Sequence, residues 1–225
     1  MHTAVRKESR PKRTVSLGLT IITVILFSLV CILAGYVIGY KFFWQKFSLT
    51  SKTDQAIAAY TLKVKQNPKD LDALVKLTWL NYQKKQYDLA VQSGNLALNL
   101  DSKQPDIHYV FGSIYLEKKD YGAAEEQFSL LYKSYPKNAL VLSGLAQTYL
   151  AQNKPQQAIP VLESLVRLDK ALVEGHLMLG EAYFDQHKNA QAVEEFRIAL
   201  TFNPDNKTAK EWLEKLGQND LKSSR

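Results

Sequence analysis

Alanine recurs every 34 residues in this chain of 225 residues, with no insertion or deletion between the copies. The five positions are Ala56, Ala90, Ala124, Ala158 and Ala192. A second column of small residues stands twelve positions before the last four alanines, at Thr78, Gly112, Ala146 and Gly180. Several columns that keep one register predict an array of a single supersecondary unit.

Each unit has the pattern of two helices joined by a short polar break. Apolar residues recur three and four apart on both sides of that break, which is the helical rhythm. The second helical stretch ends near a proline column at Pro68, Pro136 and Pro204, where proline cannot continue a helix. Small residues on both helices let their axes approach closely. Because one such hairpin cannot bury both of its apolar faces, we expect the units to stack into an all-α solenoid.

The columns of one unit hold Phe111, Gly112, Tyr115, Ala124, Phe128 and Pro136. This pattern resembles the tetratricopeptide (TPR) repeat over roughly residues 53–217. The resemblance implies a TPR α-solenoid, a right-handed superhelix of helical hairpins. The expected parts are a partial repeat at 53–70, full repeats at 71–104, 105–138, 139–172 and 173–206, a capping helix at 207–217 and a disordered tail at 218–225.

The N-terminal region has a different pattern. Residues 15–40 contain no charged side chain, and a helix of that length exceeds the ~30 Å hydrocarbon core of a bilayer. Basic side chains dominate residues 1–14, and aromatic side chains are frequent in residues 41–52. We therefore predict a basic cytoplasmic segment at 1–14, a single transmembrane helix at 15–40 and a juxtamembrane segment at 41–52. The positive-inside rule places the N-terminus in the cytoplasm and the repeats outside it, at the inner (cytoplasmic) membrane of a bacterium.

Two alternatives compete with this membrane prediction. A cleaved signal peptide has an apolar region of only ~7–15 residues, so an uncleaved anchor fits better. A receptor whose repeats face the cytosol would require the opposite orientation. Gly35 and Gly39 form a GxxxG step, which is typical of membrane helices that form homodimers. Glycine is also frequent in membrane helices generally, so both interpretations stay open.

Charge and motifs argue against several classes of function. The net charge is +7, but residues 1–14 contribute +4 of it, so the remaining chain carries only +3. This distribution favours a membrane-topology signal over nucleic-acid binding. The four histidines are scattered and the one cysteine lies in the predicted membrane segment. We therefore predict no metal site, no cofactor and no catalytic site, and hence no enzyme.

The resemblance implies that the first helices of the repeats line a concave groove that binds a peptide or protein partner. Its columns also include Lys76, Asp106 and Leu140. Trp79 is the main predicted anchor, with packing between repeats as the alternative. Lysine, arginine and asparagine, which hold acidic chaperone tails in some family members, are missing from the matching columns. The candidate groove residues are Val75, Trp79, Tyr82, Tyr109, Ser113, Leu116, Gln147, Leu177, Glu181 and Phe184.

These features predict a membrane-anchored scaffold or adaptor that recruits a protein partner. One alternative is an accessory factor in extracytoplasmic protein maturation or secretion, by analogy with cytochrome c assembly or translocon-associated proteins. Another is a subunit that presents substrates to an enzyme of envelope biosynthesis. The sequence does not identify the partner.

Overall fold

The computed structural model describes residues 25–29, 35 and 51–223, and the chain divides into two compact units, Met1–Gln55 and Ala56–Arg225. Residues 25–29 are helical, and the Ser28 hydroxyl donates a hydrogen bond to the Ile25 carbonyl oxygen at 2.8 Å. In the described ranges, no helix has the length and apolar character needed to span a bilayer. The predicted segments 15–40 and 41–52, with Gly39, lie almost wholly outside those ranges.

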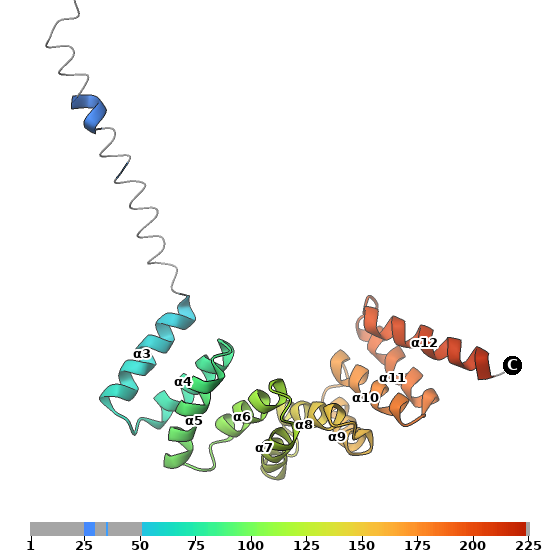
Figure 1. Cartoon of the computed structure of the whole chain (residues 1–225). Coiled ribbons are helices and arrows are strands. Elements are labelled where there is room, and N and C mark those ends of the chain that lie inside the picture. The colour runs from blue at the N-terminus through green and yellow to red at the C-terminus, as the bar shows by residue number, and fades with distance from the viewer. Residues whose placement is uncertain (1–24, 30–34, 36–50, 224–225) are drawn as a thin grey trace, which may run out of the picture. The chain divides into compact units, whose positions relative to one another are not determined.

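The second unit is built from helices that follow one another along the chain (Figure 1). Among residues 51–223 there is no β-strand. The helices are α3 (Lys52–Gln66), α4 (Leu71–Gln83), α5 (Tyr87–Leu100), α6 (Pro105–Glu117), α7 (Tyr121–Ser134), α8 (Ala139–Ala151), α9 (Pro155–Leu168), α10 (Val173–Asp185), α11 (Asn189–Phe202) and α12 (Lys207–Ser223).

Helices α4 to α11 form hairpins that pack on their neighbours in sequence order. In the pairs α4–α5, α6–α7, α8–α9 and α10–α11, the first helix begins at the first residue of a 34-residue unit. The alanine column explains the close approach of the two helices. Ala90, Ala124, Ala158 and Ala192 are all 0% exposed, so no larger side chain fits between the backbones. Ala56 on α3 is only half-buried, and α3 has no fully buried residue.

The turn inside each hairpin has one conformation that repeats every 34 residues. The residue one beyond the C-cap of the first helix has a positive φ of 57°, 61°, 56° and 57° at Lys85, Lys119, Asn153 and His187 respectively. In the second hairpin, the Lys119 and Asp120 amides donate to the Leu116 and Tyr115 carbonyl oxygens at 3.1 and 2.9 Å. This is the Schellman arrangement, which ends a helix by satisfying its last carbonyls. Glycine usually occupies the left-handed position, and none of these four turns has one.

Aromatic rings fill the spaces that glycines leave between packed helices. The ring of Phe128 on α7 is 1% exposed and lies against both Gly112 of α6 and Gly144 of α8. A Cβ atom at Gly144 would lie 2.4 Å from Phe128 Cε1. Phe196 on α11 occupies the same position against Gly180 of α10. Interiors packed at this density leave no room for an added methyl group.

The fully buried side chains form separate clusters along the array. One large cluster, named here the C-terminal core, runs from Ala124 on α7 to Leu216 on α12. Two smaller clusters lie nearer the N-terminus, one around Leu74, Ala97, Ile107 and Phe111 and the other around Ala90, Val110 and Ile114. Tyr115 is a half-buried residue that packs against both the C-terminal core and the cluster around Phe111.

The last helix covers the end of the array and is longer than the sequence predicts. Ala209 and Leu216 of α12 are 0% and 1% exposed, and Trp212 and Leu213 pack against the C-terminal core. The helix continues to Ser223, six residues beyond the predicted end of the capping helix at 217. That stretch includes Leu221 and Lys222 and has neither proline nor glycine, so nothing in it ends a helix.

Candidate functional site

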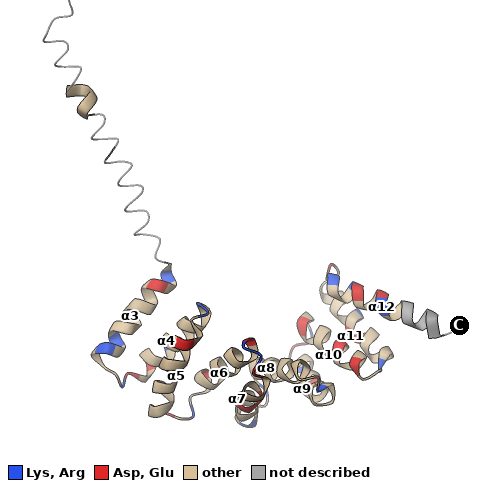
Figure 2. Ribbon diagram, viewed as in Figure 1, with Lys and Arg blue, Asp and Glu red and all other residues tan. Residues whose placement is uncertain are grey.

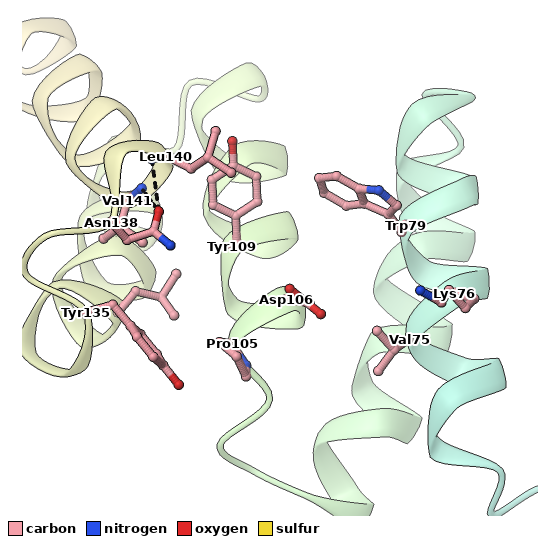
Figure 3. Close-up of a pocket in the computed structure, with 11 residues that line it drawn as sticks. Val75, Lys76, Trp79, Pro105, Asp106, Tyr109, Tyr135, Asn138, Leu140 and Val141 are labelled. Carbon is pink, nitrogen blue, oxygen red and sulfur yellow. Dashed lines mark hydrogen bonds between the residues drawn. The ribbon is translucent and has the colours of Figure 1, made fainter. Parts of the chain in front are cut away.

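A cavity of about 350 Å³ opens between the first helices of the first and second repeats and the start of the third (Figure 3). Apolar and aromatic side chains dominate its lining, and the charged residues that line it are Lys76 and Asp106. The lining residues are Val75, Lys76 and Trp79 of α4, Pro105, Asp106 and Tyr109 of α6, Leu131 of α7, Tyr135 and Asn138 of the following connection, and Leu140 and Val141 of α8. We call this cavity the aromatic groove.

Trp79 lies on the wall of the aromatic groove and not in the core between repeats. Its side chain is 37% exposed, and Figure 3 shows the indole pointing from α4 toward Tyr109 on α6. The ring centroids of Trp79 and Tyr109 are 6.0 Å apart, and those of Trp79 and Tyr82 are 5.6 Å apart. Tyr109 packs its ring edge-on to Phe128 at 5.9 Å. The exposed indole is therefore held by other aromatic rings and is preorganised for contact with a ligand.

The predicted groove residues separate into four groups, of which the last is covered by α12. The aromatic groove is lined by Val75, Trp79 and Tyr109. Three further residues do not line it: Tyr82 and Leu116, which are half-buried, and Gln147, which is exposed. Ser113 and Leu177 are 8% and 6% exposed, so their prediction as surface positions is corrected. The Ser113 hydroxyl donates to the Tyr109 carbonyl oxygen at 2.9 Å, and Leu177 belongs to the C-terminal core.

Helix α12 covers the other two predicted positions, Glu181 and Phe184. Trp212 Nε1 donates to Glu181 Oε1 at 3.2 Å, and the ring centroids of Phe184 and Trp212 are 4.9 Å apart. Burial raises the pKa of the Glu181 carboxyl, although the hydrogen bond from Trp212 opposes the shift. The acidic C-terminal end of the predicted groove is thus filled by the chain itself, and the open part is the N-terminal end.

Beside the aromatic groove, Glu117 at the end of α6 accepts hydrogen bonds from two tyrosines. Its carboxylate accepts from the hydroxyl of Tyr87 and, at 3.4 Å, from that of Tyr82. The bond to Glu117 raises the pKa of Tyr87 to about 12. Burial raises the pKa of Tyr82 as well. Both phenols therefore stay neutral at physiological pH, and Glu117 is held as a fixed acceptor.

Sequence reasoning missed the part of the lining that comes from the connection between the second and third repeats. Tyr135 of this connection is 45% exposed. Tyr135 stands directly before Pro136 in the connecting loop, outside the helical columns that were projected onto the groove. An aromatic residue next to the proline column was the available signal.

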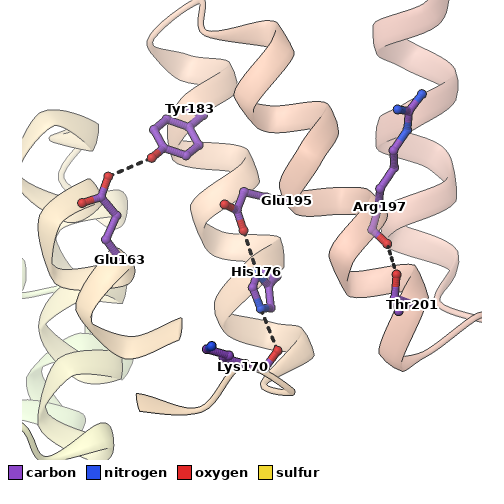
Figure 4. Close-up of polar contacts among 7 residues, drawn as sticks. All are labelled: Glu163, Lys170, His176, Tyr183, Glu195, Arg197 and Thr201. Atoms are coloured by element: carbon purple, nitrogen blue, oxygen red, sulfur yellow. Dashed lines mark hydrogen bonds and ion pairs between the residues drawn. The ribbon is translucent and has the colours of Figure 1, made fainter. Parts of the chain in front are cut away.

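His108 and His176 serve the packing of the array. His176 Nδ1 lies 2.6 Å from Glu195 Oε2, and Nε2 lies 3.1 Å from the Lys170 carbonyl oxygen (Figure 4). His108 repeats this arrangement one pair of repeats earlier, with Gln127 and the Ser102 carbonyl oxygen as its partners. Each histidine thereby ties the connection before its helix to the second helix of the same hairpin. Among the residues described, no group of three His, Cys, Asp or Glu side chains is arranged to hold a metal ion.

The family model described as "Tetratricopeptide repeat" matches residues 109–173 and 143–207. Together the two matches cover residues 109–207, which belong to the second, third and fourth hairpins and the connection that follows them. Residues 109–207 of the helical domain thus resemble the tetratricopeptide repeat family. In this chain, the first helices α4, α6 and α8 supply most of the lining of the aromatic groove.

Among curated proteins, the human DnaJ homolog subfamily C member 7 is 30% identical over 105 residues, which is 39% of this chain and 21% of the human protein. The chain thus spans about a fifth of that relative. Among solved structures, Pseudomonas aeruginosa pilF has a TM-score of 0.65 at 20% identity and covers 83% of this chain and 82% of its own. YrrB, described as a TPR protein with an unusual peptide-binding site, has a TM-score of 0.61 at 20% identity and covers 70% of this chain and 90% of its own. At such identities the two structures support the fold.

Proposed function

We propose that this protein is a non-enzymatic scaffold or adaptor that binds a protein partner through an extended peptide segment in the aromatic groove. The observation that carries the proposal is Trp79, a large aromatic side chain 37% exposed on the wall of a cavity. Tryptophan and tyrosine in a concave, partly desolvated position supply most of the binding energy at protein interfaces. The groove is lined by side chains from three successive first helices, α4, α6 and α8, an arrangement that suits an extended chain.

The proposal includes an anchor at residues 15–40 that holds the TPR domain at the membrane, with the N-terminus in the cytoplasm. Two observations support it: the absence of charge in residues 15–40 and the helical stretch at 25–29. In that stretch Ile25, Leu26, Phe27 and Leu29 are all 50% exposed or more, as lipid-facing side chains would be. Confinement near a bilayer would raise the effective concentration of partners there. Resistance of the full chain to alkaline extraction from membranes supports this anchor, and its release into the supernatant contradicts it.

Photo-crosslinking in native membranes tests the binding role. A photoreactive amino acid replaces Trp79 in one variant and Glu126, an exposed residue of α7, in the matched control. Captured proteins are identified by mass spectrometry, and helical content is compared by circular dichroism. A discrete partner captured from position 79 and not from position 126 supports the proposal. Equal capture from both positions, or none from either, contradicts it.

A further inference from the structure

The charges that surround the aromatic groove distinguish one kind of peptide from others. Basic and acidic side chains balance over residues 51–223, and Figure 2 shows the two signs interspersed along the helices. The concave positions do not share this balance. The second residue of each first helix is Asp72, Asp106, Leu140 and Glu174 in turn, and all four are exposed. A peptide in the open, N-terminal part of the groove would therefore meet the acidic Asp72 and Asp106 and then the apolar Leu140, in that order.

The protein's own last helix shows what such a surface binds. Lys215 of α12 places its ammonium 4.5 Å from the ring centroid of Phe184 and 4.1 Å from that of Trp212. Glu181, which accepts the Trp212 indole N–H, lies on the same face. A lysine over aromatic rings next to a carboxylate gains both cation–π attraction and a favourable charge interaction. The C-terminal end of the concave face is thus occupied by a basic side chain of the chain itself.

The aromatic groove offers the same combination without an occupant from the described residues. Trp79 and Tyr109 supply the rings, and Asp106 supplies a carboxylate on the lining. Leu140, 60% exposed, supplies an apolar contact at the other end. Lys76 is the one basic residue of the lining, and it stands across from Asp106 on the neighbouring helix (Figure 3).

We propose that the aromatic groove binds an extended peptide in which a large apolar side chain is flanked by lysine or arginine. The apolar side chain would occupy the space between Trp79 and Leu140, and the basic ones would face Asp72 and Asp106. This chemistry is opposite to that of an acidic tail, which Asp72, Asp106 and Glu117 repel. The inference rests on the binding role proposed for the groove and adds the chemical class of the partner.

Three fluorescent peptides of equal length test the inference by anisotropy with the full-length chain. They share a central phenylalanine and leucine and carry lysine, serine or glutamate on both sides. The lysine peptide is expected to bind roughly tenfold more tightly than the glutamate peptide, and added salt should reduce that difference. Equal binding of the three peptides, tighter binding of the glutamate peptide, or no binding of any overturns the inference.

Charge-neutralising variants locate the effect. D106N should weaken binding of the lysine peptide about threefold and leave the serine peptide unchanged. K76Q should strengthen binding of the lysine peptide and weaken binding of the glutamate peptide. E126Q, which removes an equally exposed carboxylate from α7, is the control and should change neither affinity. If E126Q lowers the affinity for the lysine peptide as much as D106N does, the net charge of the protein and not the groove explains the preference. That result would also overturn the inference.

The photo-crosslinking experiment separates this inference from the proposed function. If position 79 captures a discrete partner while the lysine peptide has no advantage, the binding role stands and the partner chemistry is wrong. If position 79 captures nothing and no peptide binds, both fail. W79A should abolish binding of every peptide; W79F, which keeps an aromatic ring, should restore part of it. This pair distinguishes loss of the contact from loss of the fold.

Discussion

Phe111 on α6 occupies the space that a side chain at position 94 on α5 would need. A Cβ atom added to Gly94 would lie 2.5 Å from Phe111 Cε1 and 2.7 Å from Cζ. In later hairpins the arrangement is reversed, because the position of Gly94 holds Phe128, Leu162 and Phe196, whereas the position of Phe111 holds Leu145 and Leu179. At the Gly94 contact the large side chain therefore comes from the first helix of the following repeat, whereas in later hairpins it comes from the second helix. In both cases one large side chain fills the space between the helices.

We predict that G94A lowers the free energy of unfolding by about 1–3 kcal/mol, because the added methyl group overlaps the Phe111 ring. The second substitution F111L makes room, so the double variant should lose less stability than the sum of the two single variants. G122A is the control, since only Asp120 Oδ1 lies within 4 Å of its added Cβ atom, at 3.9 Å. It should be neutral or stabilising by up to about 1 kcal/mol. Chemical denaturation followed by circular dichroism measures all four, and additive losses would contradict the account.

The left-handed turns offer a stabilising substitution. A residue other than glycine in this conformation costs about 1–2 kcal/mol, and Lys119 has a φ of 61°. We predict that K119G raises the thermal unfolding midpoint, with part of the gain lost to the greater freedom of glycine in the unfolded chain. K119N, which copies Asn153 of the next repeat, should fall between glycine and the wild type. K119A keeps the strain and removes the charge, so a rise in midpoint with alanine as large as that with glycine would contradict the backbone explanation.

The His176–Glu195 pair should respond differently to the removal of each partner. His176 has a side chain 6% exposed and Glu195 one 16% exposed, so H176A leaves the Glu195 carboxylate and the Lys170 carbonyl oxygen without their imidazole partner. We expect H176A to lower the free energy of unfolding by about 2–4 kcal/mol. E195Q reproduces the arrangement of His108 with Gln127, and we expect it to cost less than about 1 kcal/mol. Denaturant midpoints check both values, and an equal loss in the two variants would mean that the ion pair itself is required.

The stability of the domain should fall between about pH 10 and about pH 12. Burial, with the hydrogen bond to Glu163 at 2.8 Å, raises the pKa of Tyr183 to about 12. Since the unfolded chain has a tyrosine pKa near ~10, the neutral phenol stabilises the folded state fully below that pH, and the stabilisation is lost as the pH rises through the folded pKa. In Y183F this contribution is absent, and its denaturant midpoint should fall less steeply over the same interval. Parallel slopes for the two proteins would show that Tyr183 does not carry the effect.

The periodicity of the sequence predicts the helical solenoid because its cause is local to each hairpin. An alanine at 0% exposure, such as Ala124, marks the helix contact wherever it recurs, and the structure and the family match confirm the TPR fold. Trp79 could be assigned to the groove as one of two alternatives, because its column alone does not fix the direction of the indole. The rings of Tyr82 and Tyr109 decide it.

The remaining errors come from contacts between elements that periodicity does not relate. Leu177 shares a column with Val75, yet it packs into the C-terminal core while Val75 lines the aromatic groove. The repeat pattern gives both positions the same direction, but the elements packed around them differ. Leu177 is surrounded by the C-terminal core, whereas Val75 packs at the edge of a smaller cluster. Likewise, the burial of Glu181 depends on Trp212, which lies 31 residues further along the chain.

The aromatic groove spans the place where the buried interior of the domain changes from one cluster to the next. Val75 packs with the cluster around Phe111, whereas Leu131 and Val141 belong to the C-terminal core. Stacked repeats interact only with their neighbours, so the two ends of such an array open with different free energies. A peptide bound in the groove would contact residues of both clusters. The array with bound peptide would then unfold in a single, more cooperative transition. Binding here would couple the unfolding of the cluster around Phe111 to that of the C-terminal core.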